Sequence, residues 1–209
     1  MSSIQDSCTT HLLYLHGFRS SPRSAKALRM REWVAQHRRD LVFACPQLPP
    51  SPAEAMDLLE TLTRDWPHDT SALMGSSLGG FYATVLAEWP RFQQSRAVLL
   101  NPAVDPARDL EKHIGEQSCW QDPQDRFFFK AEFIEQLRQI RVPNSSAPQR
   151  LLAVVAKGDE VLDWREMHAR YQAGRISLLE GSDHGLSDFE DYLADLCQFL
   201  RLPVPHPQP

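Results

Sequence analysis

Short apolar runs of four to six residues recur along this chain, and stretches with the helical spacing of apolar residues lie between them. Parallel strands need a crossover connection, so this alternation predicts a parallel sheet with helices on both faces. We expect an α/β fold, a compact three-layer α/β/α sandwich with an essentially parallel six-stranded sheet. The expected strands are residues 11–15, 41–44, 71–74, 97–100, 151–156 and 176–179, and the expected helices are 25–37, 53–64, 78–89, 163–171 and 187–200.

The alternation stops between the fourth and fifth expected strands. Residues 102–150 form a long insertion with helical patterns near 106–113 and 130–140, and it contains Trp120 and the three phenylalanines at 127–129. These aromatic residues fit a lid over a binding site and the core of an ordinary helical layer equally well. A helical insertion or lid before the fifth strand is therefore part of the expected fold.

Length and composition are typical of a single domain, residues 1–209. A chain of 209 residues with 42% hydrophobic residues is large enough for one sizeable core and small for two. Residues 203–209 are rich in proline, which cannot continue a helix. We expect a flexible tail there.

Composition excludes several functional classes. A net charge of −5 and a pI near 5.9 provide no basic field for nucleic acid. No apolar run approaches the roughly 18 residues of a membrane span, and residues 1–10 lack a signal-peptide core, so we expect a cytoplasmic protein without a membrane partner. The four cysteines, Cys8, Cys45, Cys119 and Cys197, are scattered without a close pair, which argues against structural disulfides and a metal site.

A Gly-x-Ser-x-Gly pattern centred on Ser77 lies between the third expected strand and the helix after it. This arrangement is typical of a nucleophile elbow, where a sharp turn exposes the serine and leaves no room for side chains at Gly75 and Gly79. The following helix would direct the Leu78 N–H toward an oxyanion formed on attack. The alternative is a glycine-rich turn whose serine only caps a helix.

A serine nucleophile needs a base and an acid, and these should follow strands at the carboxyl edge of the sheet. His184 follows the last expected strand and Asp159 follows the fifth, so Ser77, Asp159 and His184 occur in the order Ser, acid, His. We predict that His184 is the base and Asp159 the acid. Asp163 lies in the same loop as Asp159 and is the alternative acid, while His16, directly after the first strand, is the alternative base.

A second oxyanion donor is expected in the loop after the first strand. Gly17 allows a turn there and would leave the Phe18 N–H facing Ser77, while His16 would order the loop. The predicted oxyanion hole therefore consists of the backbone N–H groups of Phe18 and Leu78.

These residues resemble the α/β-hydrolase superfamily, and more narrowly the small bacterial YqiA-type esterases. The resemblance covers about residues 12–200 and implies esterase activity on short acyl chains, with Ser77 as nucleophile, Asp159 as acid and His184 as base. It also implies a shortened fold whose first strand corresponds to the third strand of larger hydrolases. The segments that carry the resemblance are 13–18 with 20–22, 75–84, 101–104, 158–163 and 183–192.

The leading functional hypothesis is a serine esterase or thioesterase that cleaves small acyl substrates without a metal or organic cofactor. A second hypothesis is an acyl-peptidase or C–C bond hydrolase, because one triad serves several carbonyl chemistries. A third, from a different class, is a non-catalytic ligand-binding relative of the hydrolases. The presence of all three polar residues, Ser77, Asp159 and His184, argues against the third.

Overall fold

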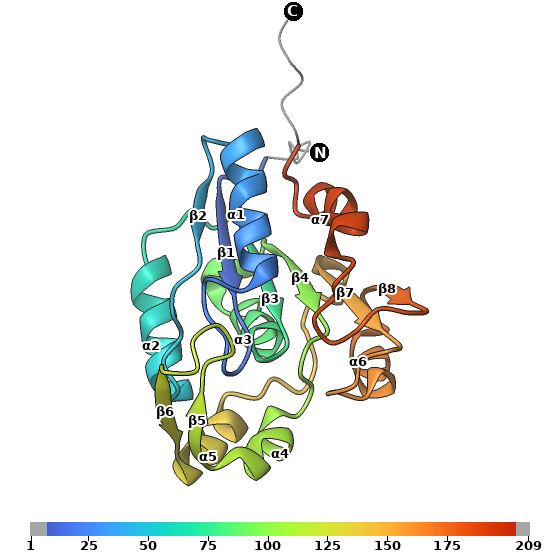
Figure 1. The fold of residues 1–209 in the computed structure, drawn as a ribbon. Helices are drawn as coiled ribbons and strands as arrows, with labels where there is room; N and C mark the ends of the chain where they lie inside the picture. Colours follow the sequence, from blue (N-terminus) through green and yellow to red (C-terminus); the bar gives the residue numbers. More distant parts are fainter. Residues whose placement is uncertain (1–7, 204–209) are drawn as a thin grey trace, which may run out of the picture.

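The computed structural model describes residues 8–203, and its six-stranded sheet is parallel throughout. The strand order is β2-β1-β3-β4-β7-β8, so β1, β3, β4 and β7 are central (Figure 1). The tail expected at 203–209 lies outside the described residues except for its first residue. The strands are β1 His11–Leu15, β2 Val42–Ala44, β3 Ser71–Ser76, β4 Arg96–Leu100, β7 Leu151–Ala156 and β8 Arg175–Leu179.

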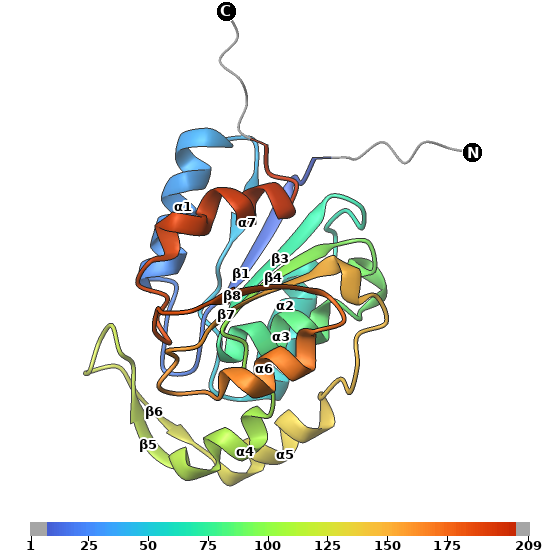
Figure 2. The ribbon, with the colours of Figure 1, turned by 90° about the vertical axis from the view of Figure 1, so that its right-hand side faces the viewer.

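Helices cover both faces of the sheet, which confirms the three-layer α/β/α architecture (Figure 2). Alternate side chains of the central strands point to opposite faces, so each face has its own apolar layer. The helices on one face are α1 Ala25–His37 and α7 Leu193–Phe199, and those on the other are α2 Pro52–Thr63, α3 Leu78–Leu86 and α6 Trp164–Tyr171.

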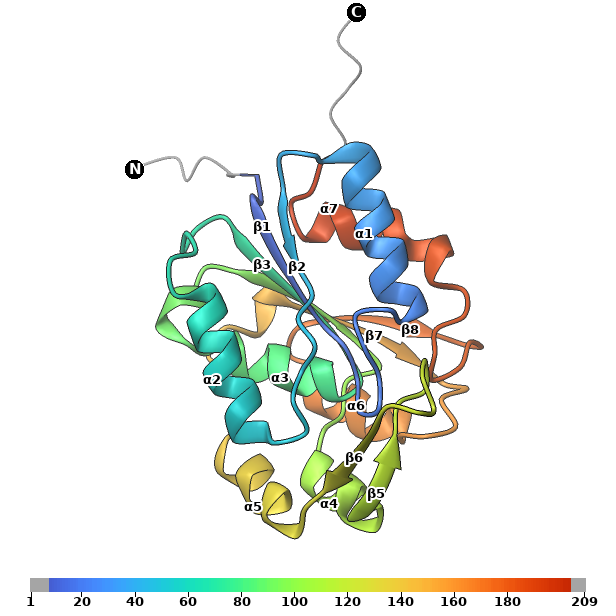
Figure 3. The ribbon, with the colours of Figure 1, turned by 60° about the vertical axis from the view of Figure 1, so that its left-hand side comes forward.

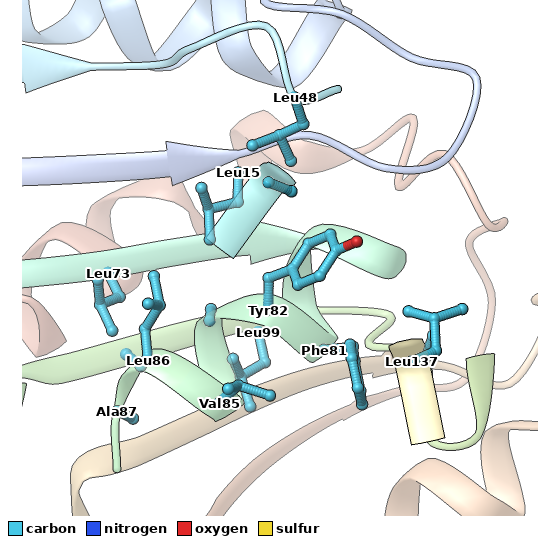
Figure 4. Packing of buried hydrophobic residues seen from close by; sticks show 14 of the residues in the cluster. Leu15, Leu48, Leu73, Phe81, Tyr82, Val85, Leu86, Ala87, Leu99 and Leu137 are labelled. Atoms are coloured by element: carbon cyan, nitrogen blue, oxygen red, sulfur yellow. The ribbon is translucent and has the colours of Figure 1, made fainter. Parts of the chain in front are cut away.

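Helix α3 begins directly after Ser77, and its residues 79–86 are all buried. Leucines from three neighbouring strands meet the apolar side chains of α3 across the sheet face (Figure 4). Each fully buried leucine contributes about 1.5–3 kcal/mol relative to an exposed one, so this layer fixes the start of α3 firmly. The packed side chains include Leu15, Leu73 and Leu99 of the sheet and Tyr82, Val85 and Leu86 of α3.

The insertion lies beyond the carboxyl ends of the strands (Figure 3). The two expected helices are present, but an antiparallel hairpin between them, with Gly115 paired to Phe129, was not predicted. The aromatic residues divide: Phe129 is buried, whereas Trp120 and Phe128 are 66% and 58% exposed. The insertion consists of α4 Pro106–Leu110, β5 Gly115–Ser118, β6 Arg126–Phe129 and α5 Ala131–Gln139.

The remaining differences from expectation are at element ends. The last expected helix is divided into a 3₁₀ turn and the shorter α7, and α3 ends earlier than expected. Within residues 8–203, no helix is long and apolar enough to cross a membrane. The 3₁₀ segments are Pro90–Phe92, Glu111–His113, Pro148–Arg150 and Phe189–Tyr192.

Candidate active site

Ser77 forms the turn between β3 and α3 and has a strained backbone. Its φ of 54° and ψ of −119° lie in a region that a non-glycine residue rarely adopts. Surrounding hydrogen bonds hold this conformation: the Ser77 N–H donates to the Leu100 carbonyl at 2.9 Å, and the Ser77 carbonyl accepts from Gly80 at 2.9 Å and Ala103 at 3.1 Å. The turn presents the serine hydroxyl at the carboxyl edge of the sheet.

The glycines on either side of Ser77 are required by close backbone approaches. A Cβ on Gly79 would lie 2.0 Å from the Leu15 carbonyl oxygen, and a Cβ on Gly75 would lie 2.1 Å from the Gly79 carbonyl oxygen. Both distances are far below van der Waals contact. The Gly-x-Ser-x-Gly pattern therefore has the steric origin that the sequence predicted.

The His184 imidazole lies between Ser77 and Asp159. Its Nε2 is 3.2 Å from Ser77 Oγ, and its Nδ1 is 2.8 Å from Asp159 Oδ2. An ionised carboxylate only accepts, so Nδ1 carries the proton and Nε2 is free to accept from the serine hydroxyl. The structure thus brings all three residues together in the order required for proton transfer.

Asp159 and Asp163 have different places in their shared loop. The Asp159 side chain is fully buried, and its Oδ1 accepts from the Val161 and Leu162 N–H groups at 2.8 Å each, which leaves Oδ2 for His184. Asp163 instead caps α6 by accepting from the Arg165 N–H at 2.9 Å. Geometry therefore associates Asp159, and not Asp163, with the imidazole.

The loop after β1 passes directly over Ser77. A Cβ built on Gly17 would lie only 3.2 Å from Ser77 Cβ, so the next residue, Phe18, begins beside Ser77. Leu78 is the first residue of α3 and adjoins it from the other side. Within residues 8–203, neither the Phe18 nor the Leu78 N–H donates to a protein acceptor, so both are available to a ligand.

His16 holds this loop and makes no hydrogen bond to Ser77. Its Nδ1 is 2.9 Å from the Gly17 carbonyl, and its Nε2 accepts from the Leu48 N–H at 3.0 Å. Burial lowers the pKa of His16, and the hydrogen bond with Gly17 opposes this effect in part. The lowered pKa favours the neutral ring that these contacts require. Both ring nitrogens are therefore engaged in ordering the loop.

A cavity of about 570 Å³ opens beside Ser77 and His184, between the carboxyl edge of the sheet and the insertion. Its volume falls in the range of small-molecule sites. Helix α4 and Trp120 supply one wall, so the insertion forms part of the site. The apolar lining includes Leu78, Ala103, Pro106, Leu110, Val161 and Leu162, and the charged lining includes Arg19, Asp109, Lys112 and Glu160.

Three further residues organise the site and were not predicted to do so. Glu160 Oε2 accepts from the His184 N–H at 3.0 Å, and Arg19 Nε donates to the Ser118 carbonyl at 2.8 Å. The buried Asn101 side chain donates to the carbonyls of Asp183 and His184. The available sequence signal was their position directly after strands or beside predicted site residues.

Metal ligands are not grouped in the part of the chain that the structure describes. Across residues 8–203, no three His, Cys, Asp or Glu side chains lie together in a way that could hold a metal ion. Ser77, His184, Phe18 and Leu78 line the cavity, and Asp159 contacts the His184 imidazole. Their arrangement suits attack on a carbonyl carbon.

Comparison with solved structures identifies the fold. A candidate hydrolase from Agrobacterium vitis S4 has a TM-score of 0.72 at 18% identity, over 96% of this chain and 91% of that one. Mouse alpha/beta hydrolase domain-containing protein 10 has a TM-score of 0.64 at 14% identity, over 92% and 91% of the two chains. A monoacylglycerol lipase from Paleococcus ferrophilus has a TM-score of 0.66 at 15% identity, over 93% and 96%.

The sequence also matches a protein-family model over residues 11–201. That range runs from the first strand to the residues after α7, so it includes the whole sheet and the candidate site. This chain belongs to the uncharacterised protein family UPF0227, the YqiA-type family that its motifs predicted, and it has the α/β-hydrolase fold.

Proposed function

We propose that this protein is a serine hydrolase that cleaves small carboxylic esters or thioesters through an acyl-enzyme intermediate. The observation that carries the proposal is the His184 imidazole, with Nε2 at 3.2 Å from Ser77 Oγ and Nδ1 at 2.8 Å from the buried Asp159 carboxylate. The esterases and lipases among proteins of this fold support it.

In the proposed reaction, Ser77 Oγ attacks the acyl carbon as His184 Nε2 accepts the hydroxyl proton. The carbonyl π bond breaks, and its electron pair forms an oxyanion. When the tetrahedral species collapses, the bond to the leaving oxygen or sulfur breaks and His184 donates the proton to that atom. A water molecule, deprotonated in the same way, then releases the acid and restores Ser77.

The two backbone N–H groups and Asp159 have different roles in this scheme. The Phe18 and Leu78 N–H groups would donate to the oxyanion, and removal of one such donor from other hydrolases slows turnover about 10²–10³-fold. Asp159 holds the imidazole in the required tautomer and stabilises the imidazolium. Its two hydrogen bonds from Val161 and Leu162 keep the carboxylate from turning away.

The size of the cavity supports a small acyl substrate. About 570 Å³ accommodates a short acyl group together with a modest alcohol or thiol portion. The apolar walls from Ala103, Pro106 and Leu110 suit the hydrocarbon part of an acyl chain. Neither a metal nor an organic cofactor is needed for this chemistry.

The test is to incubate the protein with a fluorophosphonate probe and then to measure turnover of p-nitrophenyl esters of increasing chain length and of a matched thioester. We expect labelling at Ser77 and highest kcat/KM for short chains. The variant S77A should lose labelling and at least about 10⁴-fold of kcat. The matched control is S76A, which removes the neighbouring hydroxyl and should keep both.

The outcomes separate the candidate functions. Labelling without ester or thioester turnover would indicate another acyl or C–C hydrolase that uses the same three residues. Absence of both labelling and turnover would contradict a hydrolase and favour a ligand-binding protein.

A further inference from the structure

Asn101 is a buried polar residue at the edge of the sheet where Ser77 and His184 meet. It directly follows β4, is 0% exposed, and has a φ of 40°. Asparagine adopts this left-handed region more readily than most side chains. A residue at this position needs both a permissive backbone and hydrogen bonds for any polar atom it buries.

The side-chain amide of Asn101 forms hydrogen bonds with three backbone groups. Its Oδ1 accepts from the Ala156 N–H at 2.8 Å, and its Nδ2 donates to the carbonyls of Asp183 at 3.0 Å and His184 at 3.3 Å. One donor and two acceptors fix the orientation of the amide, because the flipped form would place like groups together at all three contacts. The side chain therefore joins the end of β7 to the loop that carries His184.

The backbone around Asn101 holds the nucleophile as well. The Leu100 carbonyl accepts from the Ser77 N–H at 2.9 Å, and the Ala103 N–H donates to the Ser77 carbonyl at 3.1 Å. A Cβ built on Gly80 would lie 2.8 Å from the Pro102 Cβ, so Pro102 packs directly against Gly80. Residues 100–103 thus contact both the serine turn and the histidine loop.

The proposed acid is tied to the same point. The Ala156 carbonyl accepts from the Asp159 N–H at 3.2 Å, so the turn that carries the carboxylate begins at the residue whose own N–H donates to Asn101. Two long side chains also form hydrogen bonds with the backbone of the loop that carries His184: Glu160 accepts from the His184 N–H, and Lys26 donates to the Gly185 carbonyl. Long side chains have more rotamer freedom to lose than a buried asparagine.

We infer that Asn101 is a positioning residue: its amide sets the place of the His184 imidazole relative to Ser77 and Asp159. The inference rests on the proposed hydrolase function and names a residue that acts through the base. Proton transfer depends steeply on this geometry, and a displacement of about 1 Å costs on the order of 10²-fold in rate.

The test compares N101D and N101G with the wild type. In N101D the shape is kept and the acceptor for Ala156 is retained, but an oxygen now faces the Asp183 and His184 carbonyls. In N101G the φ of 40° is relaxed and the whole amide is removed. For a short p-nitrophenyl ester we expect kcat to fall about 10–100-fold in both, with KM within about threefold, and fluorophosphonate labelling to slow by the same factor as kcat.

The matched control is S71A. Ser71 is also buried and its hydroxyl donates to the Pro67 carbonyl at 2.6 Å, but it lies at the opposite end of β3. A general loss of stability would appear in S71A without a loss of kcat. Assays are run at least about 10 °C below the Tm of each variant, so that each is folded.

A spectroscopic readout makes the test independent of turnover. The proton that His184 Nδ1 donates to Asp159 should give a downfield NMR signal in the wild type, assigned by its loss in H184Q. We expect N101D to shift or broaden this signal and S71A to preserve it. If the wild type hydrolyses nothing, the proposed function fails and this signal alone decides the role of Asn101.

Three results would overturn the inference. The first is folded N101D and N101G with kcat within about twofold of the wild type, and the second is an unchanged histidine signal in both. The third is failure of both variants to fold, which would make Asn101 a folding residue and not a positioning one.

Discussion

Arg19 stacks its guanidinium on the indole of Trp120, with Cζ 4.0 Å from the ring centroid, while the backbone N–H of Trp120 donates to the Arg19 carbonyl at 2.7 Å. Arg19 Nε also donates to the Ser118 carbonyl at 2.8 Å, so one residue contacts the hairpin at both sides of Cys119. Arg19 directly follows Phe18, whose N–H is the proposed donor to the oxyanion. The β5–β6 hairpin and the loop after β1 are therefore joined through Arg19.

The first prediction concerns this link. R19Q removes the stacking on Trp120 and the charged hydrogen bond to Ser118. Together these two interactions stabilise the packing of the β5–β6 hairpin against the loop after β1 by about 1–2 kcal/mol. We expect hydrogen exchange in residues 114–129 to become about tenfold faster, and kcat/KM for short esters to fall severalfold because the Phe18 N–H is less well held. Hydrogen-exchange mass spectrometry and steady-state kinetics measure the two effects.

The control for R19Q is R23Q. Arg23 reaches the same hairpin through Asp122, but at 3.8 Å and with both side chains largely exposed, so the pair contributes little. Exchange in the hairpin should be unchanged in R23Q. Equal exchange in R19Q and the wild type would show that the hairpin is held by other contacts.

The second prediction separates the two aspartates of the β7–α6 loop. D159N replaces the carboxylate beside His184 Nδ1, so the amide can present a donor there and the imidazole loses its orienting acceptor. We expect kcat to fall about 10⁴-fold. D163N keeps a side-chain oxygen that can accept from the Arg165 N–H and loses only the negative charge at the start of α6, so the free energy of unfolding should fall by less than about 1 kcal/mol, with kcat within about twofold. If D163N alone abolishes turnover, the assignment of the acid is wrong.

The third prediction tests the steric origin of the elbow. In G79A, the new Cβ would meet the Leu15 carbonyl oxygen at 2.0 Å, so β1 and α3 must separate. We expect the free energy of unfolding to fall by about 3 kcal/mol, measured by urea denaturation. The control G181A places a Cβ in open space and should change it by less than about 1 kcal/mol. A stable G79A would mean that the elbow has room to adjust.

The sheet, and the meeting of Ser77, Asp159 and His184 at its edge, were predictable because their signals are local. Leu12 to Leu15 form a continuous apolar run because β1 is buried on both faces, and this needs no knowledge of the partners. His184 and Asp159 could be selected because each follows a strand, and parallel strands bring their carboxyl ends to one edge. The position of Asp159 relative to Asp163 follows from the same rule, since Asp159 is nearer the strand end.

The hairpin and Asn101 were not predictable because their determinants are distant in sequence. The sequence of β5, which includes Glu116 and Gln117, has no alternation of apolar and polar residues. The strand is held by its partner strand, whose Phe129 packs in the core, and by the hydrogen bond from Arg19 to Ser118. In the sequence, Asn101 stands between an apolar run and Pro102, a pattern that indicates the end of a strand and nothing about its side-chain partners. Its contacts with Asp183 and His184 span more than 80 residues of chain, so only the folded structure reveals them.

The buried neutral state of His16 makes stability depend on pH. The ring accepts from the Leu48 N–H, which requires an unprotonated Nε2, and burial lowers the pKa of the ring below that of an unfolded histidine, about 6.5. Below pH 6.5 the unfolded chain therefore binds a proton that the folded chain resists. The stabilisation is complete above that pH and is lost as pH falls.

The fourth prediction is that the free energy of unfolding decreases as pH is lowered from 7 to 5, and that H16Q has a smaller slope. One proton of difference corresponds to at most about 1.4 kcal/mol per pH unit. The pKa values of His11 and His113 are also lowered by burial, so H16Q should reduce the slope without abolishing it. Urea denaturation at each pH measures this, with H68Q, which removes an exposed histidine, as the control. A wild-type slope in H16Q would show that His16 binds a proton as readily in the folded as in the unfolded chain, and the loop over Ser77 would then need a different anchor.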